Sequence, residues 1–126
     1  MTLYTPSKEL LSEVLELDIR ESKYKDIDNM LLRYGYWQEC ISNGKDISGV
    51  EYAKINIYEL AHKCKEWAWL KYKKNIVSTY LGSAYIFPLN GEQHETTEPE
   101  AIFKACEWIL EQNKIRIDTH NPPAGG

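Results

Sequence analysis

The second half of the chain carries a hydrophobic pattern that predicts a long helix. Asn56 is suited to cap its start, because Glu59 can reach back to Asn56 and Ile55 can pack on Leu60 as a hydrophobic staple. Between residues 57 and 73, apolar side chains recur at the three- and four-residue spacing of one helix face: Ile57, Leu60, Ala61, Cys64, Trp67 and Ala68.

A second helix is predicted to begin near Thr97, which lies three residues before Glu100, with Pro99 in the first turn. Between the two helices, residues 76–81 and 84–89 are rich in β-branched and aromatic side chains, which favours strands. Gly82-Ser83 is suited to a two-residue turn that joins them. These elements predict an α-β-β-α core: an α+β fold in which helices pack on a small antiparallel sheet.

In the first half of the chain, Thr5-Pro6 predicts the start of a helix that ends near Asp18, with an apolar stripe of Leu10, Leu11, Val14 and Leu15. Residues 19–25 and 30–38 are predicted as two strands, although the second segment also fits a short helix. The turn-forming residues between 42 and 49 predict a mobile loop over residues 42–54.

The length of 126 residues fits one domain over residues 1–120, followed by a disordered tail at 121–126. Without a signal sequence or an apolar span, the expected location is the cytoplasm, with no membrane partner. The three cysteines lack the spacing of a disulfide framework or a zinc site, and Cys64 and Cys106 fall on apolar helix faces. A net charge of −4 makes duplex nucleic acid an unlikely partner.

Beside the apolar stripe of the 57–73 helix lies a flank that combines aromatic rings with cations. Such a flank can stack a base while its cations meet phosphate, so it is the predicted ligand-binding site for a nucleotide or nucleic acid. The alternative, which we favour, is that its two large rings only widen the buried face while the lysines extend to solvent. The flank consists of Tyr58, His62, Lys65, Trp69 and Lys73.

A second set of candidate residues is acidic and is predicted to contact a protein partner: Glu92, Glu95, Glu98, Glu107 and Glu111. His94 lies among the first three of these glutamates, but a solvated loop explains it better than a cation site. Glu59, His62 and Glu66 have the spacing of a helical metal motif, but a second copy of the motif is missing. We therefore expect no metal and no cofactor.

The last helix is apolar around more than half of its circumference, and only Lys104, Glu107 and Glu111 form a polar strip. Such a helix is either covered by both a sheet and another helix or contributes to a subunit interface, which makes a homodimer an open alternative.

Three segments carry a resemblance to a known family: Leu-Leu-Ser-Glu-Val-Leu in the first helix, the stretch from Tyr58 to Trp67, and the stretch from Glu98 to Leu110. In layout and helix signature the chain resembles the small phage and prophage proteins grouped as the phage ABA sandwich domain. The resemblance implies helices on either side of a small sheet and a phage origin, with no established activity. The segment from about Met30 to Ala53 does not fit the family pattern.

From this resemblance we hypothesise a phage-derived, non-enzymatic binding protein that antagonises bacterial immunity in the host cell. It would act either by gripping a host defence protein through the acidic residues or by sequestering a nucleotide messenger at the Tyr58 to Lys73 flank. The alternatives are a metal-dependent nucleotide hydrolase that uses Glu59, His62 and Glu66, or an accessory factor that binds single-stranded nucleic acid.

Overall fold

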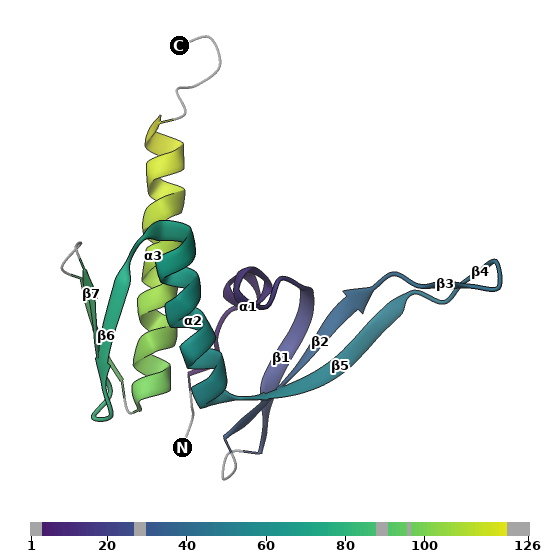
Figure 1. Cartoon of the computed structure of the whole chain (residues 1–126), viewed down its shortest axis with the longest axis horizontal. Helices are drawn as coiled ribbons and strands as arrows, with labels where there is room; N and C mark the ends of the chain where they lie inside the picture. Colours follow the sequence, from purple (N-terminus) through teal and green to yellow (C-terminus); the bar gives the residue numbers. More distant parts are fainter. Residues whose placement is uncertain (1–3, 27–29, 88–90, 96, 121–126) are drawn as a thin grey trace.

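The computed structural model describes residues 4–26, 30–87, 91–95 and 97–120, so the predicted disordered tail lies outside the described residues. The described part contains three α-helices and several small antiparallel sheets, which confirms the predicted α+β class (Figure 1). In chain order the elements are α1 (Lys8–Leu15), β1 (Asp18–Asp26), β2 (Leu31–Gln38), β3 (Ile41–Ser42), β4 (Lys45–Asp46), β5 (Gly49–Asn56), α2 (Ile57–Tyr72), β6 (Asn75–Thr79), β7 (Ser83–Phe87), β8 (Gly91–His94) and α3 (Glu98–His120).

Helix α1 is shorter than predicted, because its cap is Ser7 rather than Thr5. The Ser7 side chain accepts a hydrogen bond from the backbone N–H of Leu10. The helix ends where Glu16 adopts a left-handed backbone, with φ of 56°. Leu10 and Leu11, both in the predicted stripe, are completely buried and fix the helix against the core.

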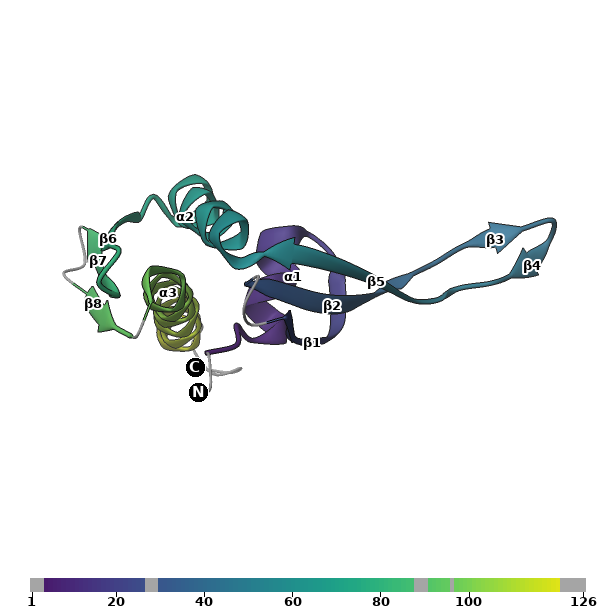
Figure 2. The same ribbon diagram turned by 90° about the horizontal axis from the view of Figure 1, so that it is seen from below.

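The first sheet has the order β1-β2-β5, with β2 in the centre and all pairs antiparallel. This confirms the two predicted strands and excludes a short helix at 30–38. The predicted loop over 42–54 is wrong, because β5 pairs with β2 without a break from Leu31↔Asn56 to Gln38↔Gly49. The hairpin continues through β3 and β4, and only Asn43 and Gly44 form its turn, with φ of 52° and 76°. Both views show the result, a long two-stranded arm that extends away from the rest of the molecule (Figures 1 and 2).

Helix α2 begins as predicted at an Asn56 cap, where the Asn56 side-chain oxygen accepts from the N–H of Tyr58 at 2.8 Å. Ile55 and Leu60 are both buried, as the staple requires. The helix ends at Lys73, whose φ of 56° places it in the left-handed region.

The second sheet has the order β6-β7-β8, so the core is α-β-β-β-α and contains one strand more than predicted. The predicted turn is also shifted. Thr79 pairs with Ser83, and Gly82, with φ of 94°, donates to the Thr79 carbonyl. This is a three-residue loop that closes on a left-handed glycine, not the predicted two-residue turn at Gly82-Ser83.

Helices α2 and α3 form a pair that contacts only one face of the second sheet. Ile76, Ala84 and Ile86 point from that face into the core, whereas Val77 and Phe87 on the other face are about half exposed. The resemblance implies helices on both sides of the sheet, so the observed layering differs from it. On the far side of the helix pair lie α1 and the first sheet (Figure 2).

Helix α3 is covered by the sheet on one side and by α2 and α1 on the other, which is the first of the two alternatives for so apolar a helix. Cys64 and Cys106 are buried between α2 and α3, as predicted, and burial raises the pKa of the Cys106 thiol well above its usual value. The apolar surface of α3 thus finds its partners within the chain. A homodimer remains a prediction.

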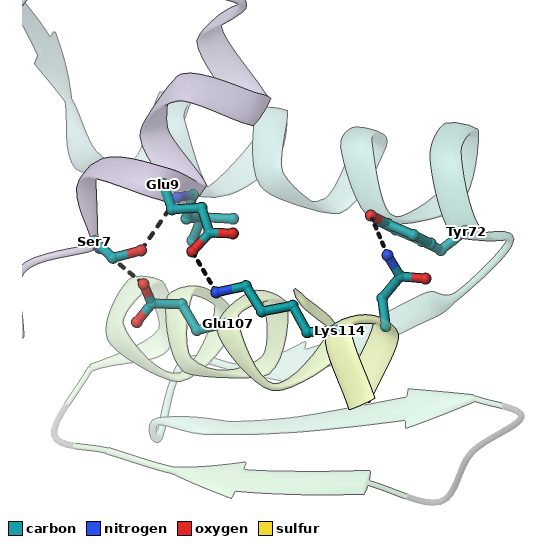
Figure 3. Close-up of polar contacts among 7 residues, drawn as sticks. Ser7, Glu9, Tyr72, Glu107 and Lys114 are labelled. Atoms are coloured by element: carbon teal, nitrogen blue, oxygen red, sulfur yellow. Dashed lines mark hydrogen bonds and ion pairs between the residues drawn. The ribbon is translucent and has the colours of Figure 1, made fainter. Parts of the chain in front are cut away.

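The polar strip of α3 binds the start of α1 (Figure 3). Glu107 accepts from the Ser7 N–H at 2.8 Å, and Lys114 donates to Glu9 at 2.6 Å. Two turns before Glu107, the buried carboxylate of Glu100 accepts from the Tyr4 N–H at 2.8 Å. These contacts fasten the N-terminal segment, and with it the first sheet, to the helix pair.

Tyr24 on β1 completes this connection, and it makes the stability of the fold sensitive to alkaline pH. Its hydroxyl donates to the Tyr4 carbonyl, and burial followed by the charge of Glu100 raises the Tyr24 pKa to about 12. Because the pKa of Tyr24 is higher in the folded than in the unfolded protein, its hydrogen bond contributes fully to stability below pH 10. This contribution is lost as the pH rises to about 12.

We therefore expect Tyr24→Phe to cost about 1 kcal/mol at pH 8, the usual value of one hydrogen bond, and the difference from wild type to shrink between pH 10 and 12. Urea unfolding of both proteins across this range measures it, and the other tyrosines cancel because they titrate in both. A difference that stays constant to pH 12 would contradict the prediction.

Candidate functional site

The predicted ligand-binding residues on α2 form one exposed stripe. Tyr58 and Trp69 expose 54% and 52% of their surfaces, so the alternative in which their rings widen the buried face is wrong. The reason is that α3 and the second sheet already cover the adjacent core stripe, which includes Leu60, Cys64 and Trp67.

Only the first half of this stripe lines a pocket. Tyr58, His62 and Lys65, with Ala61, surround about 160 Å³ together with Glu98, Pro99 and Ile102 of α3. This volume is below the range of about 300–1,000 Å³ that is common for small-molecule sites. Lys73 lies outside the pocket, with its Nζ 5.2 Å from the centre of the Trp69 ring. The structure therefore brings three of the five predicted residues together and leaves the other two as a separate pair.

The predicted acidic residues do not make one free surface. Three of them already have partners in the fold: Glu95 binds Lys104 at 2.5 Å, Glu98 accepts from Ser78, and Glu107 accepts from Ser7. Burial raises the pKa of Glu107, and the Ser7 N–H opposes that shift. Glu92 lies on β8 and Glu111 is exposed on α3. Charge that is already committed to internal contacts is a weak basis for binding a basic partner.

The metal alternative rests on side chains that point to solvent. His62 binds Glu66 with an Nε2–Oε1 distance of 2.8 Å, and Glu59 is exposed on the same helix. His94 contacts Glu92 at 3.3 Å and Ser83 at 3.0 Å. Within the described ranges, no three His, Cys, Asp or Glu side chains are close enough together to hold a metal ion.

The most distinctive surface was missed by the sequence reasoning. The face of β1-β2-β5 that bears Ile19, Leu32 and Ile55 is buried, so the residues that alternate with these lie on the opposite face. We call this opposite face the outer sheet face. It consists of Asp18, Arg20, Glu21, Lys23, Arg33, Gly35, Trp37, Val50, Tyr52 and Lys54.

Two exposed aromatic rings on this face are each paired with an arginine. The Arg33 guanidinium lies 4.1 Å from the centre of the Tyr52 ring, and the Arg20 guanidinium lies 5.1 Å from the Trp37 ring. Arg20 also binds Asp18 at 2.9 Å, and this hydrogen bond lowers the pKa of the Asp18 carboxyl. Tyr52 and Trp37 nevertheless keep 48% and 37% of their surfaces exposed.

Gly35 leaves room for the Tyr52 ring beside the backbone of β2. A Cβ at this position would come within 2.9 Å of the Tyr52 ring and 3.0 Å of the Val50 side chain. The missing side chain leaves a shallow space that these two residues cover. The alternation Arg33-x-Gly35-x-Trp37 was visible in the sequence, but its partner Val50-x-Tyr52-x-Lys54 fell in the segment that was predicted as a loop.

A groove of about 600 Å³ also separates α1 from α2. Its floor contains Trp67, whose buried Nε1 has no hydrogen-bond partner within the described part of the chain. Both signs of charge line it, and Lys71 is already bound to Glu13, so the groove indicates no single ligand chemistry. The other lining residues are Ser12, Val14, Glu16, Lys63, Glu66 and Leu70.

Comparison of this chain with protein-family models, with curated proteins and with solved structures finds no match. Among the described residues, no helix has both the length and the apolar character needed to cross a membrane.

Proposed function

We propose that this chain is a non-enzymatic binding protein and that the outer sheet face is its main contact surface. One observation carries the proposal: Trp37 and Tyr52 are exposed side by side with Arg33 and Arg20 on a sheet face that no element of the described chain covers. Trp, Tyr and Arg are the residues that contribute most to binding energy at interfaces. Large rings on an uncovered face cost solubility, so their presence favours a role in recognition.

The resemblance to phage ABA sandwich proteins extends this proposal to a role in the host cell. On that basis the bound partner belongs to bacterial immunity, and binding would antagonise a defence system without any chemistry by the phage protein. The phage origin, the defence role and the absence of catalysis rest on the resemblance and on the sequence, whereas the contact surface rests on geometry.

A second candidate function is capture of a nucleotide messenger at the pocket beneath Tyr58, His62 and Lys65. The observation in its favour is that an aromatic ring and a cation line the same hollow. Glu98 in the wall opposes a phosphate there, and the small volume would need a second copy of the chain to close over the ligand.

Two double variants distinguish the outer sheet face from the α2 surface as the contact surface. Trp37→Ala with Tyr52→Ala removes the rings of the outer sheet face, and Trp69→Ala with Lys65→Ala removes a ring and a cation from α2. All four side chains are at least partly exposed, so the free energy of unfolding of both variants is expected to lie within about 1 kcal/mol of the wild-type value.

Native mass spectrometry of each protein, isolated from a bacterial host, measures what stays bound. We expect the wild type and the α2 variant to retain the same macromolecule and the outer-face variant to lose at least about 90% of it, as loss of two interface anchors implies. Loss from the α2 variant alone, or retention by all three, would show that the outer sheet face is not the contact surface.

A further inference from the structure

Three cations on the outer sheet face lie in register across the sheet. Lys23 on β1 pairs with Arg33 on β2, and Arg33 pairs with Lys54 on β5. Neighbouring strands are about 4.8 Å apart, so the row spans about 10 Å, enough to neutralise adjacent phosphates of one extended strand. Among the side chains that the structure describes on this face, four cations, with Arg20 included, stand against the two anions Asp18 and Glu21, although the whole chain has a charge of −4. These side chains therefore carry an excess of positive charge.

The two rings lie beside this row and keep 48% (Tyr52) and 37% (Trp37) of their surfaces exposed. An arginine guanidinium lies over one face of each ring, and a base can stack on that guanidinium plane or displace it from the ring. Trp37 pairs with Val50, and Tyr52 lies two residues further along β5, which makes Trp37 and Tyr52 diagonal neighbours whose Cα atoms are about 7–8 Å apart. Exposed aromatic rings on neighbouring strands of an antiparallel sheet are suited to stack unpaired bases. In a duplex the bases are stacked on one another and cannot reach the rings.

Taking the outer sheet face as the contact surface proposed above, we infer that its ligand is a single-stranded nucleic acid. The cation row of Lys23, Arg33 and Lys54 binds the phosphates, and Trp37 and Tyr52 stack two bases. An acidic protein segment would satisfy the cations, but it could stack on the rings only through aromatic side chains of its own, whereas every nucleotide carries a planar base. The same chemistry accommodates DNA and RNA, and sequence preference is expected to be weak because stacking is sequence-tolerant.

Fluorescence anisotropy tests this inference with labelled twelve-nucleotide oligo-dT, oligo-rU and a mixed-sequence duplex of the same length, titrated with the full chain at low salt. We expect at least one of the two single strands to bind at least about tenfold more tightly than the duplex, since only unpaired bases can stack on the rings. Comparison of dT with rU shows whether the ligand is DNA or RNA. Equal affinity for the duplex, or no saturable binding to either single strand, would overturn the inference.

Variants assign the binding to this face. Trp37→Ala with Tyr52→Ala is expected to weaken binding at least about tenfold. Tyr80→Ala with Phe87→Ala, which removes two exposed rings from the β6–β7 hairpin, is expected to leave binding unchanged. Arg33→Ala with Lys54→Ala is expected to reduce the slope of log K against log salt by about 1.4, which is two phosphate contacts. Circular dichroism confirms that each variant is folded. Unchanged affinity and slope in the outer-face variants would overturn the inference.

Failure of this inference differs from failure of the proposed function. If the wild type retains a protein that the outer-face variant loses, and no oligonucleotide binds, the surface is right and the ligand class is wrong. If neither a partner nor an oligonucleotide depends on Trp37 and Tyr52, both are wrong.

Discussion

Phe103→Ala is expected to lower the free energy of unfolding by about 4 kcal/mol. Phe103 lies in α3, is completely buried and is the largest of the fully buried side chains. Its helix is packed between the second sheet and the pair α1 and α2, so we expect most of the vacated volume to remain as a cavity. Urea unfolding followed by circular dichroism measures the change.

Phe87→Ala is the matched control, because Phe87 is the other phenylalanine of the chain. It lies on the face of the second sheet that points away from the helix pair, with 47% of its surface exposed. The same change of side chain there is expected to cost less than about 1 kcal/mol, since much of the ring never leaves water. Similar losses for both variants would mean that this exposed face of the second sheet is covered in solution, which would favour a homodimer over a monomer.

The sequence was sufficient where local chemistry decides the structure. Asn56 and Thr97 lie at the starts of α2 and α3, and both produce a helix within one residue of the predicted position. The apolar stripe from Ile57 to Ala68 is buried as predicted. Caps and stripes need only residues within one or two turns of the chain, so their signal is complete in a short window.

The arm could not be predicted in this way, because its order comes from pairing across the sheet. In the segment from Gly49 to Asn56 only Ile55 is buried, so burial leaves little alternation to detect. Ser48-Gly49 resembles a turn, yet Ser48 accepts from the Cys40 N–H and Ile47 donates to the Cys40 carbonyl, which holds the two strands in line. A loop over residues 42–54 leaves Lys54 without a position in the sheet, so the sequence does not predict the row of Lys23, Arg33 and Lys54.

The candidate site was predicted only in part for the same reason. Tyr58, His62 and Lys65 follow one another at helical spacing, so the sequence placed them together and the structure confirms this. The outer sheet face combines three strands whose register depends on contacts between residues 18–26, 31–38 and 49–56. Such a surface becomes visible only when the register is known.

Glu100→Ala is expected to lower the free energy of unfolding by about 3 kcal/mol, and the reason could not be read from its cap position alone. As predicted, Thr97 and Glu100 interact at the start of α3. The Thr97 hydroxyl accepts from the Glu100 N–H and donates to Glu100 Oε1 at 2.7 Å. The side chain is also 98% buried, and its Oε2 accepts from the Tyr4 N–H at 2.8 Å, across almost the whole chain. Hydrogen bonds to a charged group contribute about 1.5–3 kcal/mol each, and the helix N-terminus adds a favourable field.

Glu111→Ala is the control for this variant, because it removes an exposed carboxylate from the same helix and should change stability by less than about 0.5 kcal/mol. A loss below about 1 kcal/mol for Glu100→Ala would mean that the buried carboxylate does not hold the N-terminal segment.

The position of the outer sheet face depends on the same carboxylate. Glu100 holds the Tyr4 N–H, and the Tyr4 carbonyl accepts from Tyr24 on β1, so the two bonds connect α3 to the first sheet through one residue. Because they share Tyr4, Glu100→Ala and Tyr24→Phe are expected to be non-additive, with a coupling energy above about 0.5 kcal/mol in a double-mutant cycle. Additive losses would mean that the N-terminal segment is anchored elsewhere and that the sheet keeps its place on the helix pair without this connection.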